Sequence, residues 1–262
     1  MIDLDIFSYR LYILMIYEIK SLEGMMAMVY CISDIHGCYA EFMKLLQKIK
    51  FNKNDTLYVL GDMIDRGENG MECLDYIRSQ PNIVALMGNH EMMMLGYYPG
   101  SGRKRDYLWL TQGGIQMLKQ INRLKLSKDC RKRWNETLNW VRGLPLCIEV
   151  TVNNNDYFLS HAGFDATKPM EQQTAFDHVW ARENFILYPA ISGKTCIFGH
   201  TPTIALRGNS DSSIWSDPNH KDKICIDGGC VYGGALAALR LDDGAVFYVK
   251  YEKADEALNV AA

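Results

Sequence analysis

Six short runs of apolar residues in the chain are each followed at once by polar residues. The runs span residues 29–33, 57–61, 83–88, 157–160, 196–199 and 224–226. Each is rich in Val, Ile, Leu, Tyr or Phe, which is typical of a buried strand. Apolar residues at helical spacing occupy residues 38–50 and 70–79, between the first three runs. This alternation predicts a mostly parallel sheet in the first half of the chain.

The rest of the chain is first helical and then rich in strands. Helices are expected over residues 106–124 and 130–141, and Pro145 closes this stretch. Further strands are expected at residues 146–152, 156–160, 194–198, 223–226, 235–241 and 245–251. Residues 153–155 and 242–244, Asn-Asn-Asn and Asp-Asp-Gly, are typical of hairpin turns. The most economical arrangement is an α/β (α+β) fold with two facing mixed β-sheets flanked by helices.

The polar residues that follow the apolar runs are of the types that bind metal ions. They are Asp34, His36, Asp62, Asn89, His90, His161, His200 and Asp227. A residue just past the carboxyl end of a strand lies at the rim of a sheet, so several such ends side by side bring these side chains together. Carboxylate and amide oxygens mixed with imidazoles suit divalent Mn, Fe, Zn or Co. One carboxylate shared between two ions would make a two-metal site.

The most informative motif is GDMIDRG at residues 61–67. Asp62 can bridge two cations with its two oxygens, and Asp65, one turn further on, can orient a neighbouring imidazole. Arg66 offers a forked donor that matches two phosphate oxygens. The alternative interpretation is a charged β-turn with an Asp–Arg pair at the surface.

Residues 88–91, GNHE, place an amide next to a histidine. Adjacent loop residues point in different directions, so Asn89 and His90 are expected to have different tasks. We expect Asn89 to ligate a metal through its oxygen and His90 to face the substrate as a proton donor. Glu91 is expected to cap the following helix or to bind a backbone group.

Two more histidines, His161 and His200, each follow a predicted strand. Either one alone is more often a core or turn histidine, and residues 34–37 alone would suit a turn before a helix cap. Taken together, the motifs supply enough ligands for a second coordination sphere. His178 and His220 lack the strand-end context and are assigned no role.

Composition and charge restrict the class of protein. The 262 residues permit one large domain or two small ones, and 48% hydrophobic and 23% charged residues are ordinary for a soluble globule. The net charge of −3 argues against nucleic-acid binding over the whole surface. Eight cysteines form no CxxC pair, and Cys31, Cys196 and Cys225 lie inside apolar runs. They are interpreted as buried hydrophobes, which favours the reducing cytoplasm.

The start of the chain carries an apolar stretch at residues 11–17. A spanning helix needs roughly 20 apolar residues, so no membrane partner is expected. Asp3 and Asp5 stand where a signal peptide would be basic. Residues 1–27 are interpreted as an N-terminal extension, and the alternative is a short amphipathic helix that packs on the body or on a partner.

The domain organisation follows from these elements. We expect one domain over residues 28–251, with a helical insert at about 103–143, and a C-terminal tail at residues 252–262. Nothing in the sequence predicts the oligomeric state.

The motifs together resemble those of a known family. DIHG (34–37), GDMIDRG (61–67), GNHE (88–91), SHAG (160–163) and FGHTP (198–202) are similar to the signature series of the PPP-type metallophosphoesterases. That family includes bacterial and phage serine/threonine protein phosphatases and symmetrical dinucleoside tetraphosphate hydrolases. WLTQGG (109–114) and IDGGCVYGG (226–234) resemble the bacterial branch, although Gly228 stands where Thr is common. Ala162, where eukaryotic members have Gly, also favours that branch. The resemblance runs from about Met28 to Tyr251.

The resemblance implies a metallophosphoesterase-like four-layer sandwich with two divalent ions, for which Mn²⁺ is the expected choice and Fe, Zn or Co are alternatives. It implies that one ion is held by Asp34, His36 and Asp62, and the other by Asp62, Asn89, His161 and His200. It also implies a second phosphate-binding arginine, for which Arg182 is the candidate beside Arg66 and Asn89. A helix-surface arginine is the alternative for Arg182.

The expected activity is that of a metal-dependent phosphomonoesterase, first of all a serine/threonine protein phosphatase. A metal-bridging hydroxide would attack phosphorus directly, His90 would protonate the leaving oxygen, and Asp65 would fix the imidazole. The expected partner is therefore a phosphoprotein or a phosphorylated small molecule. The alternative is a symmetrical dinucleoside tetraphosphate hydrolase. A binding scaffold without catalysis is not favoured, because no ligand and no acid is missing.

The predicted insert bears on the substrate. Between Arg103 and Arg142 there are eleven Lys or Arg residues against three acidic ones. A cap of this charge beside the metals would attract an acidic phosphopeptide or a polyphosphate, and the alternative is a solvated helical face. Tyr97, Tyr98 and Trp109 could stack on an adenine or could belong to the core.

Overall fold

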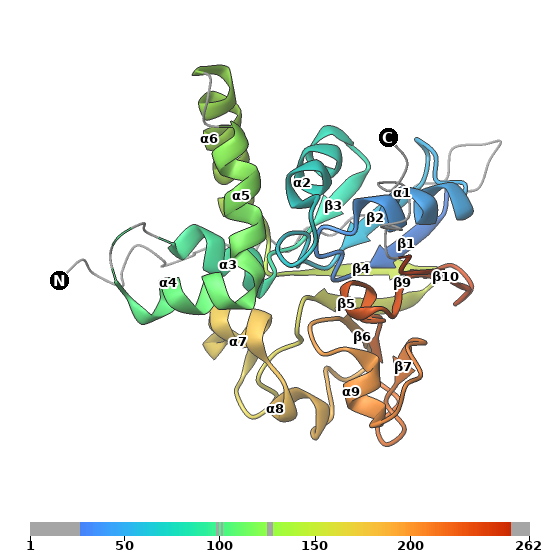
Figure 1. Ribbon diagram of the computed structural model, residues 1–262. Helices are drawn as coiled ribbons and strands as arrows, with labels where there is room; N and C mark the ends of the chain where they lie inside the picture. The colour runs from blue at the N-terminus through green and yellow to red at the C-terminus, as the bar shows by residue number, and fades with distance from the viewer. Residues whose placement is uncertain (1–26, 98–99, 101, 125–127, 253–262) are drawn as a thin grey trace.

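The computed structural model describes residues 27–97, 100, 102–124 and 128–252 (Figure 1). A first five-stranded sheet has the order β10-β9-β1-β2-β3. Its strands are β1 (Val29–Ile32), β2 (Thr56–Val59), β3 (Ile83–Ala85), β9 (Ala235–Arg240) and β10 (Val246–Lys250). β1, β2 and β3 are parallel, whereas β9 is antiparallel to both β1 and β10. The sheet is therefore mixed, as predicted.

A second five-stranded sheet has the order β4-β5-β6-β8-β7. Its strands are β4 (Cys147–Val152), β5 (Asn155–Ser160), β6 (Thr195–Phe198), β7 (Trp215–Ser216) and β8 (Lys223–Cys225). β5, β6 and β8 are parallel, and β4 and β7 run antiparallel at the two edges. Asn153 and Asn154 turn the β4–β5 hairpin with φ angles of 49° and 63°. Two such residues are what a tight right-twisted hairpin requires, which confirms the predicted turn.

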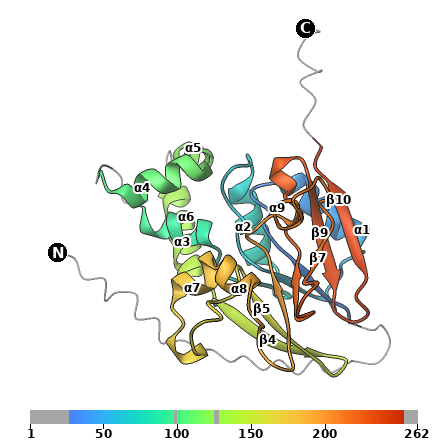
Figure 2. The same ribbon diagram turned by 90° about the horizontal axis from the view of Figure 1, so that it is seen from below.

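Helices cover both outer faces and also form the segment that the sequence predicts to be an insert (Figures 1 and 2). α1 (Tyr39–Lys48) and α2 (Gly70–Ser79) connect the parallel strands of the first sheet. The insert holds α4 (Lys104–Trp109), a π-helical segment (Leu110–Gly114), α5 (Ile115–Leu124) and α6 (Lys128–Arg142), and α3 (Asn89–Gly96) precedes it. The outer face of the second sheet carries α7 (Ala175–Trp180), α8 (Glu183–Ile186) and α9 (Thr203–Arg207). Short 3₁₀ turns occupy Met170–Gln172 and Cys230–Tyr232.

The two sheets face each other, and the alternation of side chains along each strand separates three apolar cores. Cys31 and Leu159 belong to the core between the sheets. Ile32, next to Cys31, belongs to the core under α1, α2 and the insert. Phe158, next to Leu159, packs with Phe185 of α8 on the outer side of the second sheet. The predicted fold of two facing mixed sheets flanked by helices, in four layers, is confirmed.

Some elements were not predicted. The helices α7, α8 and α9 and the two-residue strand β7 fall in segments to which the sequence analysis assigned no element of its own. The helix predicted over residues 106–124 is divided by the π-helical segment. The predictions for residues 1–26 and 253–262 lie outside the described residues. Within the described part of the chain, helices are too short or too polar to cross a membrane. Seven cysteines are free thiols: Cys31, Cys38, Cys73, Cys147, Cys196, Cys225 and Cys230.

Candidate metal centre

Several residues of the predicted site lie in loops with unusual backbone angles, whereas Asn89 and His90 begin α3. Positive φ angles occur at Asp34 (51°), His36 (46°), Asp62 (51°), Asp65 (69°), Arg66 (63°) and His200 (67°). Residues other than glycine rarely adopt such angles, and strained backbone of this kind is concentrated at functional sites. The loops also bind one another, since the N–H of His36 donates to the carbonyl of Asp62 at 2.9 Å.

Asn89, His161 and His200 form one half of the cluster. Oδ1 of Asn89 lies 2.9 Å from Nε2 of His161 and 3.0 Å from Nδ1 of His200. Nε2 of His161 also lies 3.4 Å from Oδ1 of Asp62. Asn89 follows a strand of the first sheet and the two histidines follow strands of the second, so this half of the cluster joins the two sheets.

Asp34, His36 and Asp62 form the other half. Nε2 of His36 lies 3.5 Å from Oδ2 of Asp62 and 3.9 Å from Oδ1 of Asp34. The backbone N–H of His200 donates to Oδ2 of Asp34 at 2.9 Å, which ties this half to the second sheet. The two oxygens of Asp62 therefore face different halves: Oδ2 faces His36 and Oδ1 faces His161.

Backbone carbonyls orient two of the imidazoles. Nδ1 of His36 lies 2.9 Å from the carbonyl of Ile64, and Nδ1 of His161 lies 2.8 Å from the carbonyl of Leu60. A carbonyl only accepts, so both Nδ1 atoms donate and both Nε2 atoms keep a lone pair. Burial lowers the pKa of His36, and burial together with the charge of His161 lowers the pKa of His200 to about 2. Neutral imidazoles are the form that binds metals.

The charges of the cluster fit divalent cations. Burial, followed by the negative charge of Asp34, raises the pKa of the carboxyls of Asp62 and Asp227. Among the described residues, the buried Nε2 of His200 has no hydrogen-bond partner. Two sets of donor atoms lie within 4.8 Å of one another, those of His36, Asp62 and His90, and those of Asp62, His161 and His200. Buried carboxylates that repel each other beside neutral imidazoles are stabilised by bound cations.

His90 and Asp65 form a buried pair next to the cluster. Nδ1 of His90 lies 2.6 Å from Oδ2 of Asp65, and the backbone N–H of His90 donates to Oδ1 of Asp62 at 3.0 Å. Nε2 of His90 lies 3.9 Å from Oδ2 of Asp62, so the free nitrogen of the ring faces the cluster. An imidazole held at one nitrogen by a carboxylate can donate or accept a proton at the other.

The two candidate phosphate-binding arginines lie at the same centre. The Arg66 guanidinium contacts the His36 ring and lies 5.3 Å from the centre of the Tyr232 ring. Arg182 is exposed, donates from Nη1 to Oγ1 of Thr201 at 3.2 Å, and is one of the charges that lower the pKa of His200. The structure thus brings together all ten residues that the sequence predicted to bind metal, to bind phosphate or to act in catalysis.

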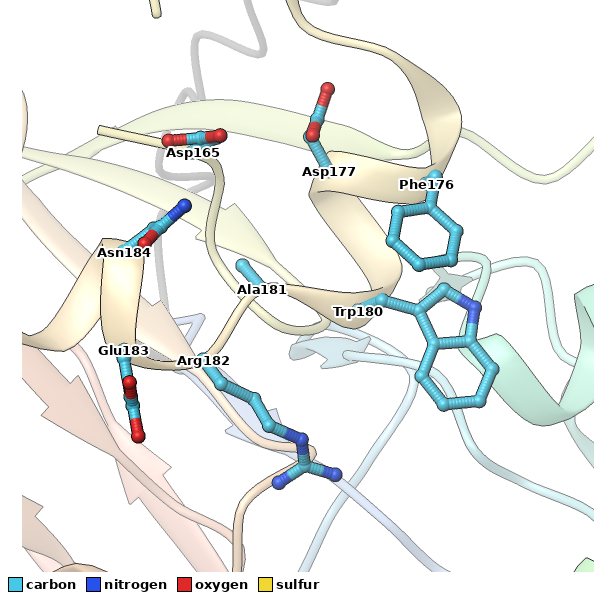
Figure 3. Close-up of a pocket in the computed structure, with 8 residues that line it drawn as sticks. All are labelled: Asp165, Phe176, Asp177, Trp180, Ala181, Arg182, Glu183 and Asn184. Carbon is cyan, nitrogen blue, oxygen red and sulfur yellow. The ribbon is translucent and has the colours of Figure 1, made fainter. Parts of the chain in front are cut away.

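An open cleft of about 340 Å³ adjoins the cluster at Arg182 (Figure 3). Phe176 and Trp180 stack on one side of it, with ring centres 5.9 Å apart and planes at 21°. The rings of Trp180 and His200 pack nearly at right angles with their centres 5.7 Å apart, whereas Phe176 is 63% exposed. The cleft is therefore separated from the candidate ligand His200 by the ring of Trp180.

The sequence did not assign roles to several residues of the centre. Asp227 is 3% exposed and follows β8, so the strand-end pattern identified it without giving it a task. The Ser33 hydroxyl donates to Oδ2 of Asp34. The Trp109 indole N–H donates to Oδ2 of Asp65 at 2.8 Å, and this contact has no local sequence signal. Trp109 is only 1% exposed, so it offers no free face to an adenine.

Glu91 holds the loops of the centre through backbone groups, as its position predicted. Its Oε2 accepts from the N–H groups of Asp62 at 2.8 Å and Gly88 at 3.0 Å, and its Oε1 accepts from Met63 at 2.8 Å. The side chain is fully buried. The carboxylate of Glu91 therefore fixes the position of Asp62 through its backbone N–H.

Replacing Glu91 by alanine is expected to destabilise the protein. Each buried N–H group left without an acceptor costs about 1–3 kcal/mol, so a loss of at least about 3 kcal/mol is expected from three of them. The free energy of unfolding, measured by chemical denaturation, checks this. The exposed Glu171→Ala substitution is the control, and equal stability of the two variants would contradict the assignment.

A third group of potential ligands, Asp217, His220 and Asp222, lies between β7 and β8. The buried ammonium of Lys223 lies 2.8 Å from Asp217 and 2.6 Å from Asp222. Because a cation of the chain itself already pairs with both carboxylates, this group is an ion-pair network.

Comparisons with known proteins agree with this geometry. The family model described as "Calcineurin-like phosphoesterase" matches residues 27–233. The chain is 31% identical over 218 residues to "Serine/threonine-protein phosphatase 1" of Salmonella typhimurium, a match that covers 81% of this chain and 91% of that protein. It is 33% identical over 136 residues to a symmetrical bis(5'-nucleosyl)-tetraphosphatase of Haemophilus ducreyi, covering 51% of this chain and 44% of that protein.

A solved structure, provisionally assigned as a diadenosine tetraphosphatase, shares the fold. It matches with a TM-score of 0.62 at 20% identity, over 89% of this chain and 97% of that one. The extent of the family match and the cluster of candidate metal ligands point to one conclusion. The chain belongs to the calcineurin-like phosphoesterase family and is a metal-dependent phosphoesterase.

Proposed function

We propose that the protein is a two-metal phosphomonoesterase that removes phosphate from phosphoserine or phosphothreonine in proteins. The observation that carries this proposal is the buried His90–Asp65 pair, whose free imidazole nitrogen faces the ligand cluster. An alkoxide is a poor leaving group and needs a proton donor in this position. The similarity to the Salmonella serine/threonine phosphatase, which spans 91% of that protein, supports the choice of substrate.

Two ions would be held by the two halves of the cluster. Asp34, His36 and Asp62 would bind one, and Asp62, Asn89, His161 and His200 would bind the other. When bound, such ions act as Lewis acids and lower the pKa of water. The chain itself holds three of these ligands in place: the carbonyls of Leu60 and Ile64 orient His161 and His36, and the carboxylate of Glu91 holds the backbone of Asp62.

Arg66 and Arg182 would bind the phosphoryl oxygens. Both guanidinium groups lie next to candidate ligands, Arg66 beside His36 and Arg182 beside His200. Forked donors match pairs of phosphate oxygens and offset charge that develops in the transition state. Asn89, between the two histidines of its half, would contribute a further contact to the phosphoryl group.

His90 would then protonate the leaving oxygen from Nε2. Asp65 keeps the proton on Nδ1 and supports the imidazolium form. Burial and the charge of Arg66 lower the pKa of His90 in the free protein, whereas a dianionic phosphate at the centre would favour its protonated form. Proton donation is therefore linked to the presence of the substrate.

A dinucleoside tetraphosphate is the second candidate substrate. The cleft at Arg182 favours it, because the stacked and partly exposed rings of Phe176 and Trp180 offer a face to a nucleobase. The similarity to the Haemophilus hydrolase supports the same candidate over 136 residues.

Turnover on a phosphoserine peptide and on diadenosine tetraphosphate, with defined divalent metals, tests the proposal. We expect faster release of phosphate from the peptide, loss of activity in excess chelator, and best recovery with Mn²⁺. Faster cleavage of the dinucleotide would favour the second candidate. Full activity after chelation would contradict the metal-dependent scheme for both substrates.

A further inference from the structure

The carboxylate of Asp65 receives two hydrogen bonds on one oxygen. Nδ1 of His90 lies 2.6 Å from its Oδ2, and Nε1 of Trp109 donates to the same oxygen at 2.8 Å. Among the described residues, the other oxygen of Asp65 is buried and has no hydrogen-bond partner. Within the described part of the chain, the carboxylate is therefore held through Oδ2 alone, by His90 and Trp109 together.

The hydrogen bond also acts on the charge of Asp65. Burial raises the pKa of this carboxyl, and the bond from Trp109 is the largest of the effects that lower it. An ionised Asp65 accepts the proton on Nδ1 of His90 and favours the tautomer with a free Nε2. The indole thus stabilises the form of Asp65 that orients the imidazole.

The segment that carries Trp109 has a backbone conformation that brings it close to Asp65 and Arg66. The segment Leu110–Gly114 follows Trp109 directly and contains a kink at Gly113, where the backbone leaves the helical conformation. A Cβ on Gly114 would lie 2.5 Å from the indole ring, so only glycine allows the ring to lie there. Gly113 has a φ of 112° and its carbonyl accepts from the N–H of Arg66 at 3.3 Å.

One segment of the insert therefore contacts both members of the Asp65–Arg66 pair. Trp109 holds the carboxylate and Gly113 holds the backbone of the arginine. Trp109 itself is 1% exposed and packs against Tyr97 with ring centres 4.8 Å apart, so its position is fixed. The two contacts link the helical insert to the loop that carries Asp65 and Arg66.

We propose that Trp109 is a positioning residue for His90, acting through the shared oxygen of Asp65, and that the insert thereby sets the orientation of the proton donor. This inference rests on the proposed function, because it requires that His90 protonates a leaving oxygen. Trp109 touches neither the candidate metal ligands nor the phosphate in this scheme. Its effect should appear only where the leaving group needs a proton.

The Trp109→Phe variant tests the inference, since phenylalanine keeps an aromatic ring and lacks the N–H. Loss of one hydrogen bond to a charged group predicts a fall in kcat of about 10- to 100-fold on a phosphoserine peptide, with KM unchanged. Turnover of p-nitrophenyl phosphate, whose leaving group needs no proton, should stay close to that of the unchanged protein. Trp140→Phe, a partly buried tryptophan of α6, is the matched control and should affect neither substrate.

Combination with Asp65→Asn gives a readout that a purely structural role would not change. Trp109 acts through Asp65, so Trp109→Phe should add little to the loss in the Asp65→Asn background. The inference would be overturned if the losses in kcat of the two single variants multiplied in the double variant. It would also be overturned if Trp109→Phe lowered kcat equally on both substrates. If Asp65→Asn alone leaves turnover of the phosphopeptide intact, the proposed role of the His90–Asp65 pair is what fails.

Gly114→Ala provides a second variant that keeps the indole N–H. Its methyl group would displace the ring, so the same dependence on the leaving group is expected, with metal content unchanged. A thermal melt of each variant accompanies the kinetics. A Gly114→Ala variant that is folded and fully active on the phosphopeptide would contradict the inference.

Discussion

Replacing His90 by asparagine is expected to lower kcat on a phosphoserine peptide by about 10²- to 10⁴-fold, the range that a general acid contributes. Without a donor at Nε2, the serine oxygen would have to leave as an alkoxide. On p-nitrophenyl phosphate the loss should be far smaller, because that leaving group is a stable anion. The comparison of the two substrates, with kcat and KM measured separately, checks the prediction.

The metal content of the His90→Asn variant shows whether His90 is a metal ligand or a proton donor. The side chain belongs to one of the sets of donor atoms that lie within 4.8 Å of each other, so it has the geometry of a ligand as well as that of an acid. As an acid, His90→Asn would keep both ions. His220→Asn, outside the centre, is the control. A variant that loses metal, or that hydrolyses the phosphopeptide at a normal rate, would refute the role of proton donor.

Replacing Asp62 by asparagine is expected to weaken the binding of both ions and to reduce activity to background. Oδ2 of Asp62 lies 3.5 Å from Nε2 of His36, and Oδ1 of Asp62 lies 3.4 Å from Nε2 of His161. An amide keeps the size of the side chain and removes its charge. Mutation of a residue that only supports a metal ligand typically lowers metal affinity by roughly 10- to 100-fold. Loss of an anionic ligand shared by both ions should lower it by at least as much.

Stability without metal distinguishes this effect from unfolding. Burial and the charge of Asp34 raise the pKa of Asp62, so its ionised form is unfavourable in the folded protein without cations. In chelator, Asp62→Asn should therefore be at least as stable as the unchanged protein. Asp156→Asn, on the exposed β4–β5 hairpin, is the control for metal content. Two tightly bound ions in Asp62→Asn would contradict the shared carboxylate.

The strands, α2 and the β4–β5 hairpin could be predicted because each depends on a pattern within a short stretch of the sequence. The apolar runs gave the strands, the spacing of Met71, Leu74 and Ile77 gave α2, and Asn153–Asn154 gave the hairpin. The convergence of the strand-end residues also followed, because parallel strands place their carboxyl ends at one edge. Asp227 was identified by the same pattern, and only its place beside Asp34 shows that it belongs to the centre.

The remaining features depend on contacts between distant segments. The bond from Trp109 to Asp65 joins residues 44 positions apart, and it requires a π-helical turn that the apolar periodicity of residues 106–124 does not reveal. α8 and α9 span only four and five residues, too few for a helical period to be recognised. Whether the basic insert would lie beside the centre could not be predicted either, since that depends on how Trp109 and Gly113 dock.

The most direct test of the two-metal centre is an anomalous difference map from crystals grown with Mn²⁺. We expect two peaks that share the Asp62 carboxylate, one next to Asp34 and His36 and the other next to Asn89, His161 and His200. A map with no peak at these residues, or with a single peak that Asp62 does not touch, would contradict the two-metal centre.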